Sequence, residues 1–138
     1  VLASFIPIII GMGGNIGTQS STIIVRGIAT GRITIGNELA TILKELKAGL
    51  ILGVLYGMML GTFAWFRFID TNPIIGVIVG LSICSSMIIA TGVGTFTPLA
   101  LRKLDIDPAI ATGPFVTTSI DILGVFLYFL IAELLLQV

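Results

Sequence analysis

Apolar residues along this chain fall into four long stretches, which are separated by bands of charged residues. Residues 1–25, 48–66 and 71–101 carry no charged side chain, and residues 108–132 carry a single one, Asp121. Each stretch is near or above the roughly 20 residues that an α-helix needs to cross about 30 Å of hydrocarbon. The pattern therefore predicts an all-α fold, a polytopic membrane helix bundle with four transmembrane helices.

The overall composition supports a membrane domain. Of 138 residues, 56% are hydrophobic and 10% are charged, and the mean hydropathy is +1.16; a soluble domain has about 25% charged residues. The net charge of zero gives no overall field that would attract nucleic acid. The single Cys84 and the lack of histidine exclude an intrachain disulfide, a Cys/His metal site and Ser-His-Asp catalysis in this chain. We interpret residues 1–138 as one domain of a longer protein, because Val1 already lies within an apolar run.

The charged connections predict how the helices are oriented in the membrane. A chain that crosses twice returns to the same side, so residues 26–47 and 102–107 share a compartment. They hold six of the seven Lys and Arg residues, and the opposite side has Arg67. The positive-inside rule then places both connections in the cytoplasm. Pro73 and Pro108 are expected to begin the third and fourth helices.

Glycines suggest how two of the helices pack. Four glycines recur every four residues in the second helix, which places them on one face where another backbone can approach closely: Gly49, Gly53, Gly57 and Gly61. We favour contact within one subunit over contact across a dimer. In the third helix, Gly92, Gly94 and Pro98 predict a kink or break near the cytoplasmic end.

Asp121 is the strongest candidate for a functional residue. It lies near the middle of its apolar stretch, where a charged side chain costs about 2.5–3.5 kcal/mol on insertion scales. No basic residue is predicted at the same depth. One alternative is a protonated Asp121 that hydrogen-bonds a neighbouring helix; we favour a carboxylate that faces water or a cation.

Polar neighbours in the fourth helix support a polar pathway. Thr117, Thr118, Gly124 and Tyr128 are expected to share the helical face of Asp121. Within a helix that begins at Pro108, Pro114 would free the carbonyl of Ile110 from its usual hydrogen bond.

The first helix carries a second polar face. In the run "GMGGNIGTQSS", Asn15, Thr18, Gln19 and Thr22 follow helical spacing, and the glycines among them are expected to expose backbone carbonyls. At 1.5 Å per residue, Asn15 and Asp121 lie roughly 15 and 20 Å from the cytoplasmic ends of their spans, so the two faces could meet. A nucleotide-binding loop is disfavoured because no strand precedes the run. Polar contacts that only hold helices together are the other alternative.

The donors gathered in this way are carboxylate, amide, hydroxyl and carbonyl oxygens, which suit hard cations such as Mg²⁺ and Ca²⁺. One carboxylate per chain is too little to strip a divalent ion of its water. Mg²⁺ dehydrates reluctantly and usually keeps several waters, so a hydrated Mg²⁺ fits the residue types best.

Two segments resemble the transmembrane domain of the MgtE family of magnesium channels and transporters. They are "PIIIGMGGNIGTQSSTIIVRGIATG" in the first helix and "PLALRKLDIDPAIATGPFVTTSIDILGVFLYF" around the fourth. The resemblance implies a homodimer with five membrane helices per subunit and an ion path at the subunit interface. The path would be lined by residues 1–25 and 108–132, with Asp121 holding hydrated Mg²⁺ and Asn15 close by. By this resemblance, we expect residues 1–138 to correspond to the family's domain without its first membrane helix and without the cytoplasmic region that senses Mg²⁺ in many members.

We therefore expect channel-like conduction of Mg²⁺ through a homodimer in the cell membrane (plasma or inner), with no catalysed reaction. A proton- or sodium-coupled divalent cation exchanger and a structural membrane subunit are the alternatives. The expected metal-binding residues are Asp121, Asn15, Gly14, Gly17, Thr18 and Thr117. The expected pore-lining residues are Gly11, Gln19, Thr22, Pro114, Thr118 and Gly124.

Overall fold

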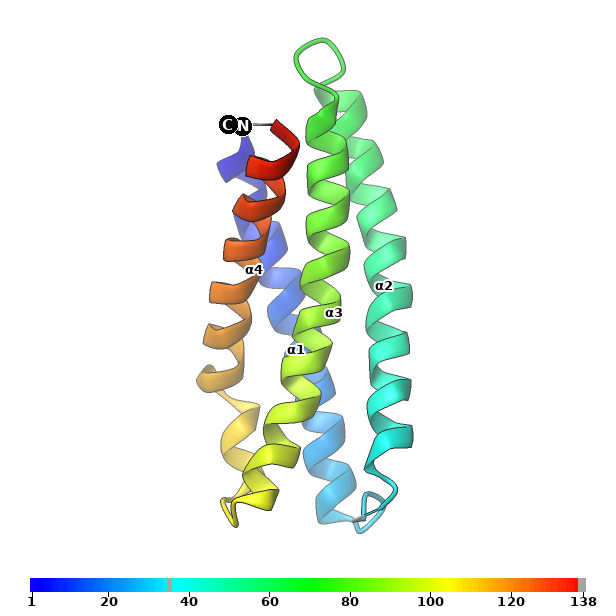
Figure 1. The fold of residues 1–138 in the computed structure, drawn as a ribbon, viewed down its shortest axis with the longest axis vertical. Coiled ribbons are helices and arrows are strands. Elements are labelled where there is room, and N and C mark those ends of the chain that lie inside the picture. Colours follow the sequence, from blue (N-terminus) through cyan, green and yellow to red (C-terminus); the bar gives the residue numbers. More distant parts are fainter. Residues whose placement is uncertain (35, 137–138) are drawn as a thin grey trace.

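The computed structural model describes residues 1–34 and 36–136, and every regular element in that part of the chain is helical. The all-α prediction is therefore confirmed. In chain order the elements are η1 (Leu2–Phe5), α1 (Ile6–Ala29), α2 (Glu38–Arg67), α3 (Ile74–Lys103), η2 (Pro108–Thr112) and α4 (Pro114–Leu136) (Figure 1).

Three helices in the described part of the chain are long and apolar enough to cross a membrane: α2, α3 and α4. The fourth predicted span, α1, has 24 residues and is long enough, but its glycines and polar residues keep it out of that set. A helix with this composition can cross a bilayer when other protein or water covers its polar side. A membrane span for α1 therefore stays a prediction.

Helix α3 is the centre of the bundle. It packs against α1, α2 and α4, and α1 also packs against α4. Figure 1 shows α2 along one side of α3 and α4 along the other. The α1–α2 loop and the α3–η2 turn lie at one end of the bundle, and the two termini and the α2–α3 turn lie at the other.

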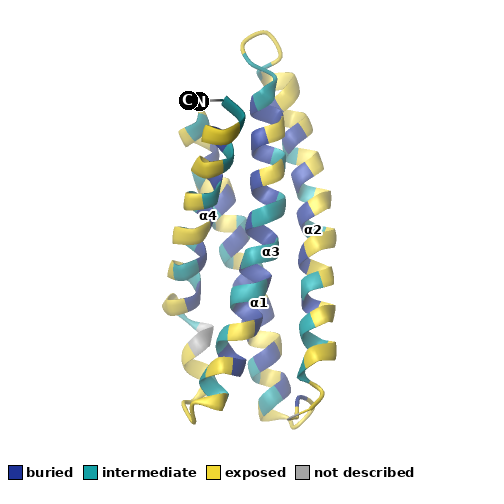
Figure 2. Ribbon diagram, viewed as in Figure 1, coloured by how far each residue is buried: buried dark blue, intermediate teal, exposed yellow. Residues whose placement is uncertain are grey.

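The buried core runs between the facing sides of these helices (Figure 2). Its fully buried members include Ile9 of α1, Ile78 of α3 and Tyr128 of α4. The hydroxyl of Tyr128 donates a hydrogen bond of 2.8 Å to the carbonyl of Leu2. The outer surface is apolar as well: Phe66 of α2 is 69% exposed. An apolar exterior of this kind is expected where lipid, rather than water, is the solvent.

The glycine repeat of α2 packs inside the chain. A Cβ atom on Gly57 would lie 2.7 Å from the carbonyl oxygen of Gly80, and one on Gly61 would lie 2.9 Å from that of Gly76. Both distances are shorter than carbon–oxygen van der Waals contact, so no side chain fits there without a shift. The preferred interpretation, contact within one subunit, is confirmed for this face.

Two local expectations concern the end of α3 and the start of α4. Helix α3 runs unbroken through Gly94 and Pro98, so the predicted break is absent, whereas a kink there stays a prediction. The fourth helix does not begin at Pro108: residues 108–112 form a separate 3₁₀ turn, Gly113 is extended, and α4 begins at Pro114. Because Pro114 stands in the first turn, where its missing N–H costs no intrahelical bond, it frees no carbonyl within a helix.

Candidate functional site

The candidate site lies where α1 and α4 pack together. The Oδ1 atom of Asp121 is 3.9 Å from the position of a Cβ atom on Gly14, which is ordinary van der Waals contact. The two polar segments therefore approach each other at these residues. Because α4 begins at Pro114, Asp121 lies about 10 Å along it at 1.5 Å per residue, half the distance expected for a helix from Pro108.

One face of α1 is not covered by the rest of the described chain. Gly11, Asn15, Gln19 and Thr22 are exposed, and Thr18 is half-buried. The opposite face is buried against α3 and α4. The polar face that the spacing predicts therefore exists, and it points away from the bundle.

Hydroxyl groups on the polar segments of α1 and α4 bond to their own helices. Thr18 donates to the carbonyl of Gly14 at 2.8 Å, and Thr22 donates to that of Thr18 at 2.8 Å. In α4, Thr117 donates to the carbonyl of Pro114 at 3.1 Å. A hydroxyl that has given its hydrogen to a carbonyl still has oxygen lone pairs. These oxygens can therefore accept hydrogen bonds from the water shell of a cation.

Not every predicted site residue reaches this face. Gly17 is buried, and a Cβ atom there would meet the side chain of Ile120 and lie 3.1 Å from the carbonyl oxygen of Ala90. Gly124 is also buried, and a Cβ atom there would lie 3.2 Å from Ser86 Oγ of α3. Both glycines allow the helices to pack closely. Thr118 and Pro114 are exposed, on the outer side of α4.

Asp121 borders a shallow hollow of about 470 Å³ with Ile10 of α1 and Ile122, Val125 and Phe126 of α4. A half-buried carboxylate thus lies among apolar side chains on the outer surface. Within residues 1–34 and 36–136, no three Asp, Glu, His or Cys side chains gather into a metal site. Asp121 is the one carboxylate that lines this hollow, and exposing it to hydrocarbon would be costly.

Sequence reasoning missed polar residues inside the bundle. Glu45, expected in a connection, belongs to α2, is buried, and accepts a hydrogen bond of 3.0 Å from the hydroxyl of Ser20. The buried hydroxyls of Ser82, Ser86 and Thr95 in α3 have no partner among the described residues. Ser82 and Ser86 are four residues apart in the sequence, and this spacing indicates that they share one face of a helix.

Comparison with known proteins identifies relatives of this chain. The model of the MgtE family, described as "Divalent cation transporter", matches residues 6–131. "Magnesium transporter MgtE" of Thermus thermophilus is 36% identical over 137 residues, which are 99% of this chain and 30% of that protein. The proteins of the same name from Bacillus subtilis and Enterococcus faecalis are 35% and 34% identical over 95% and 99% of this chain.

The chain spans about three-tenths of the length of these curated relatives. Their similarity extends along nearly the whole chain and includes both segments that meet at Asp121 and Gly14. Together with the apolar helices, it identifies an integral membrane protein. The chain belongs to the MgtE family of divalent cation transporters.

Proposed function

We propose that the protein containing this chain conducts Mg²⁺ across the membrane along a path lined by α1 and α4, with Asp121 binding the ion. The observation that carries this proposal is the approach of the Asp121 carboxylate to Gly14, beside the uncovered polar face of α1. The name of three relatives, magnesium transporter, supports Mg²⁺ as the ion.

The path is expected at the interface of a homodimer. In one chain, the polar face of α1 and the Asp121 carboxylate lie on the outside of the bundle, where lipid would leave them without partners. A second copy facing the first would cover both and enclose a polar space. Two copies of Asp121 would then supply two negative charges, which match the charge of one divalent ion.

The donors on α1 suit an ion that keeps its water. Asn15 and Gln19 carry amide groups on the exposed face, and the Thr18 hydroxyl oxygen lies beside them. Such groups bond well to water, whereas a bare Mg²⁺ needs six close ligands in octahedral geometry. Asp121 is expected to attract the hydrated ion, and the amides are expected to hold its water shell.

The membrane potential is the proposed driving force. Moving one elementary charge through 100 mV yields about 2.3 kcal/mol, so a divalent ion gains about twice that amount. The end of the bundle with residues 26–47 and 102–107 is proposed to face the cytoplasm, because it carries six of the seven basic residues. Mg²⁺ would then flow inward, toward that end.

The test is Mg²⁺ uptake into liposomes that hold the full-length protein, with the membrane potential set and pH and sodium equal on both sides. We expect Asp121→Asn to abolish uptake. The matched control is Glu133→Gln, which removes an exposed carboxylate from the same helix near its other end and should conduct like wild type. Equal uptake by Asp121→Asn and wild type would assign Asp121 a structural role. Uptake that requires a pH or sodium gradient would indicate an exchanger.

A further inference from the structure

A second hollow, of about 600 Å³, lies where the end of α1 meets the loop to α2 and the first turns of α2. It is well separated in sequence from Asp121, and it differs in its chemistry. Its polar lining consists of Arg26, Thr30, Arg32, Thr41, Lys44 and Glu45. Ile23 and Ile33 provide an apolar border. The volume lies within the range of about 300–1,000 Å³ that is usual for small-molecule sites.

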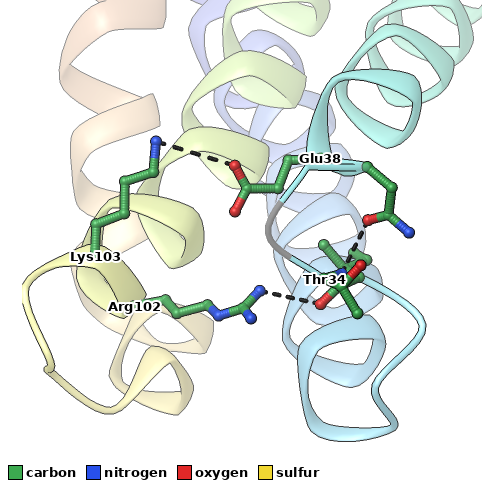
Figure 3. A network of polar contacts seen from close by, with 6 residues as sticks. Thr34, Glu38, Arg102 and Lys103 are labelled. Carbon is green, nitrogen blue, oxygen red and sulfur yellow. Dashed lines mark hydrogen bonds and ion pairs between the residues drawn. The ribbon is translucent and has the colours of Figure 1, made fainter.

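The loop that carries part of this lining is held from two sides. Ile33 packs on Gly27, where a Cβ atom would lie 2.5 Å from Ile33 Cδ1, and its N–H donates to the Gly27 carbonyl at 3.0 Å. On the other side, Arg102 Nη1 of α3 donates to the Ile33 carbonyl at 3.0 Å (Figure 3). The loop that carries Thr30 and Arg32 is therefore held in place by contacts with α1 and α3.

The charges of the hollow favour an anion. It has three basic side chains and one acidic one, an excess of two positive charges. The acidic side chain, Glu45, is buried and accepts the hydroxyl of Ser20. The described residues form one ion pair, between Lys103 and Glu38 at 4.0 Å (Figure 3). Within that part of the chain, Arg26, Arg32 and Lys44 are therefore not paired with a carboxylate. A cation such as Mg²⁺ would be repelled here.

Each basic residue also has an ordinary explanation. Arg26 lies in the last turn of α1, where a positive charge stabilises the helix dipole, and basic residues are common at the cytoplasmic ends of membrane helices. Neither explanation requires three such side chains and two threonines to line one hollow. Thr30 donates its hydroxyl hydrogen to the Arg26 carbonyl at 2.8 Å, so the three cations carry the binding. Convergence of arginine and lysine side chains is the pattern that binds phosphate oxygens.

We propose that this hollow binds a phosphate group, supplied by the phosphodiester of an anionic phospholipid at the membrane surface. The position supports a lipid: α2 carries charged side chains up to Lys47 and none from Ala48 to Phe66, so the hollow lies at the boundary between headgroups and hydrocarbon. Basic pockets between membrane helices on the cytoplasmic side are suited to anionic headgroups. Arg26, Arg32 and Lys44 bind the phosphate oxygens, and Ile23 borders the glycerol end.

The test is native mass spectrometry of the full-length protein in detergent, titrated with phosphatidylglycerol or phosphatidylcholine. Wild type is expected to bind phosphatidylglycerol more tightly. The variant Arg26→Gln/Lys44→Gln should lose about tenfold or more of that affinity, since hydrogen bonds to charged groups contribute strongly. The matched control Lys47→Gln/Arg67→Gln removes the same charge from outside the hollow and should bind like wild type.

Competition with inorganic phosphate distinguishes the two sources of the group. Phosphatidylglycerol binding that depends on Arg26 and Lys44 and resists millimolar phosphate supports the lipid. In another outcome, inorganic phosphate binds through the same residues while the protein shows no preference for phosphatidylglycerol. That result overturns the lipid and assigns the hollow to the free phosphate ion. Equal lipid binding by the two double variants, with no phosphate binding, overturns the proposal. If Arg26→Gln/Lys44→Gln fails to fold, Lys44→Gln against Lys47→Gln repeats the comparison at two exposed positions of α2.

Discussion

The Asp121 carboxylate and Gly14 face each other across the contact of α1 with α4. Oδ1 of Asp121 lies 3.9 Å from where a Cβ atom of Gly14 would be. One turn further along α1, Gly17 makes a much tighter contact with α3 and α4. The two glycines therefore have different roles, although the sequence presents them in one run.

This difference predicts opposite outcomes for two alanine substitutions. Gly14→Ala places a methyl group in ordinary contact with Asp121, so the protein should fold normally while Mg²⁺ uptake falls several-fold because water near the carboxylate is displaced. Gly17→Ala drives a methyl group against Ile120 and the Ala90 carbonyl, and such overpacking costs about 1–3 kcal/mol. Thermal unfolding in detergent, measured beside uptake, checks both. A lower Tm for Gly14→Ala than for Gly17→Ala would contradict the assignment.

Close packing of α2 on α3 predicts a stability effect far from the site. Gly57→Ala would place a Cβ atom 2.7 Å from the Gly80 carbonyl oxygen, so we expect a loss of about 1–3 kcal/mol and a lower Tm. The control is Met58→Ala, at the next residue, which is 62% exposed on the outer surface. Equal melting temperatures for the two variants would show that the glycine contact is not tight.

The hydrogen bond between Tyr128 and Leu2 joins the two ends of the chain. Tyr128→Phe removes a bond of 2.8 Å from a fully buried side chain, and we expect a loss of about 1 kcal/mol in the free energy of unfolding. Tyr56→Phe is the control, since Tyr56 is half-buried on α2 and should change stability little. Denaturation of the two variants in the same detergent makes the comparison.

The uncovered face of α1 predicts which positions touch water. In a Cys84→Ala background, Gln19→Cys should react with a water-soluble thiol reagent, and the modification should block Mg²⁺ uptake. Met59→Cys, at an exposed position on the outer side of α2, should react slowly because lipid covers it. Faster modification of Met59→Cys than of Gln19→Cys would place the aqueous path elsewhere.

Much of the fold could be predicted from the pattern of charges, because a bilayer demands long apolar helices and strongly penalises charges within them. The glycine repeat predicted the face of α2 that meets α3. The start of α4 was mispredicted because two prolines, Pro108 and Pro114, both suit a first helical turn, and the extended backbone of Gly113 decides between them.

The candidate site could be predicted in part. Helical spacing identified the polar face of α1, since that face follows from local periodicity. Asp121 was singled out because it is a charge within an apolar stretch, and its role in binding the ion stays a prediction. The same periodicity could not show that Gly17 and Gly124 face the interior, because this depends on where Ile120 and Ser86 lie in other helices. Burial of Glu45 was missed for the same reason: its partner, Ser20, is 25 residues away in the sequence.

The central claim is that Mg²⁺ passes down the membrane potential while held by Asp121. The most direct measurement is the current carried by the full-length protein in a planar bilayer, with Mg²⁺ as the permeant cation and equal pH and sodium on both sides. We predict a current that follows voltage in wild type and in Glu133→Gln and is lost in Asp121→Asn. A Mg²⁺ current of wild-type size in Asp121→Asn would contradict the claim.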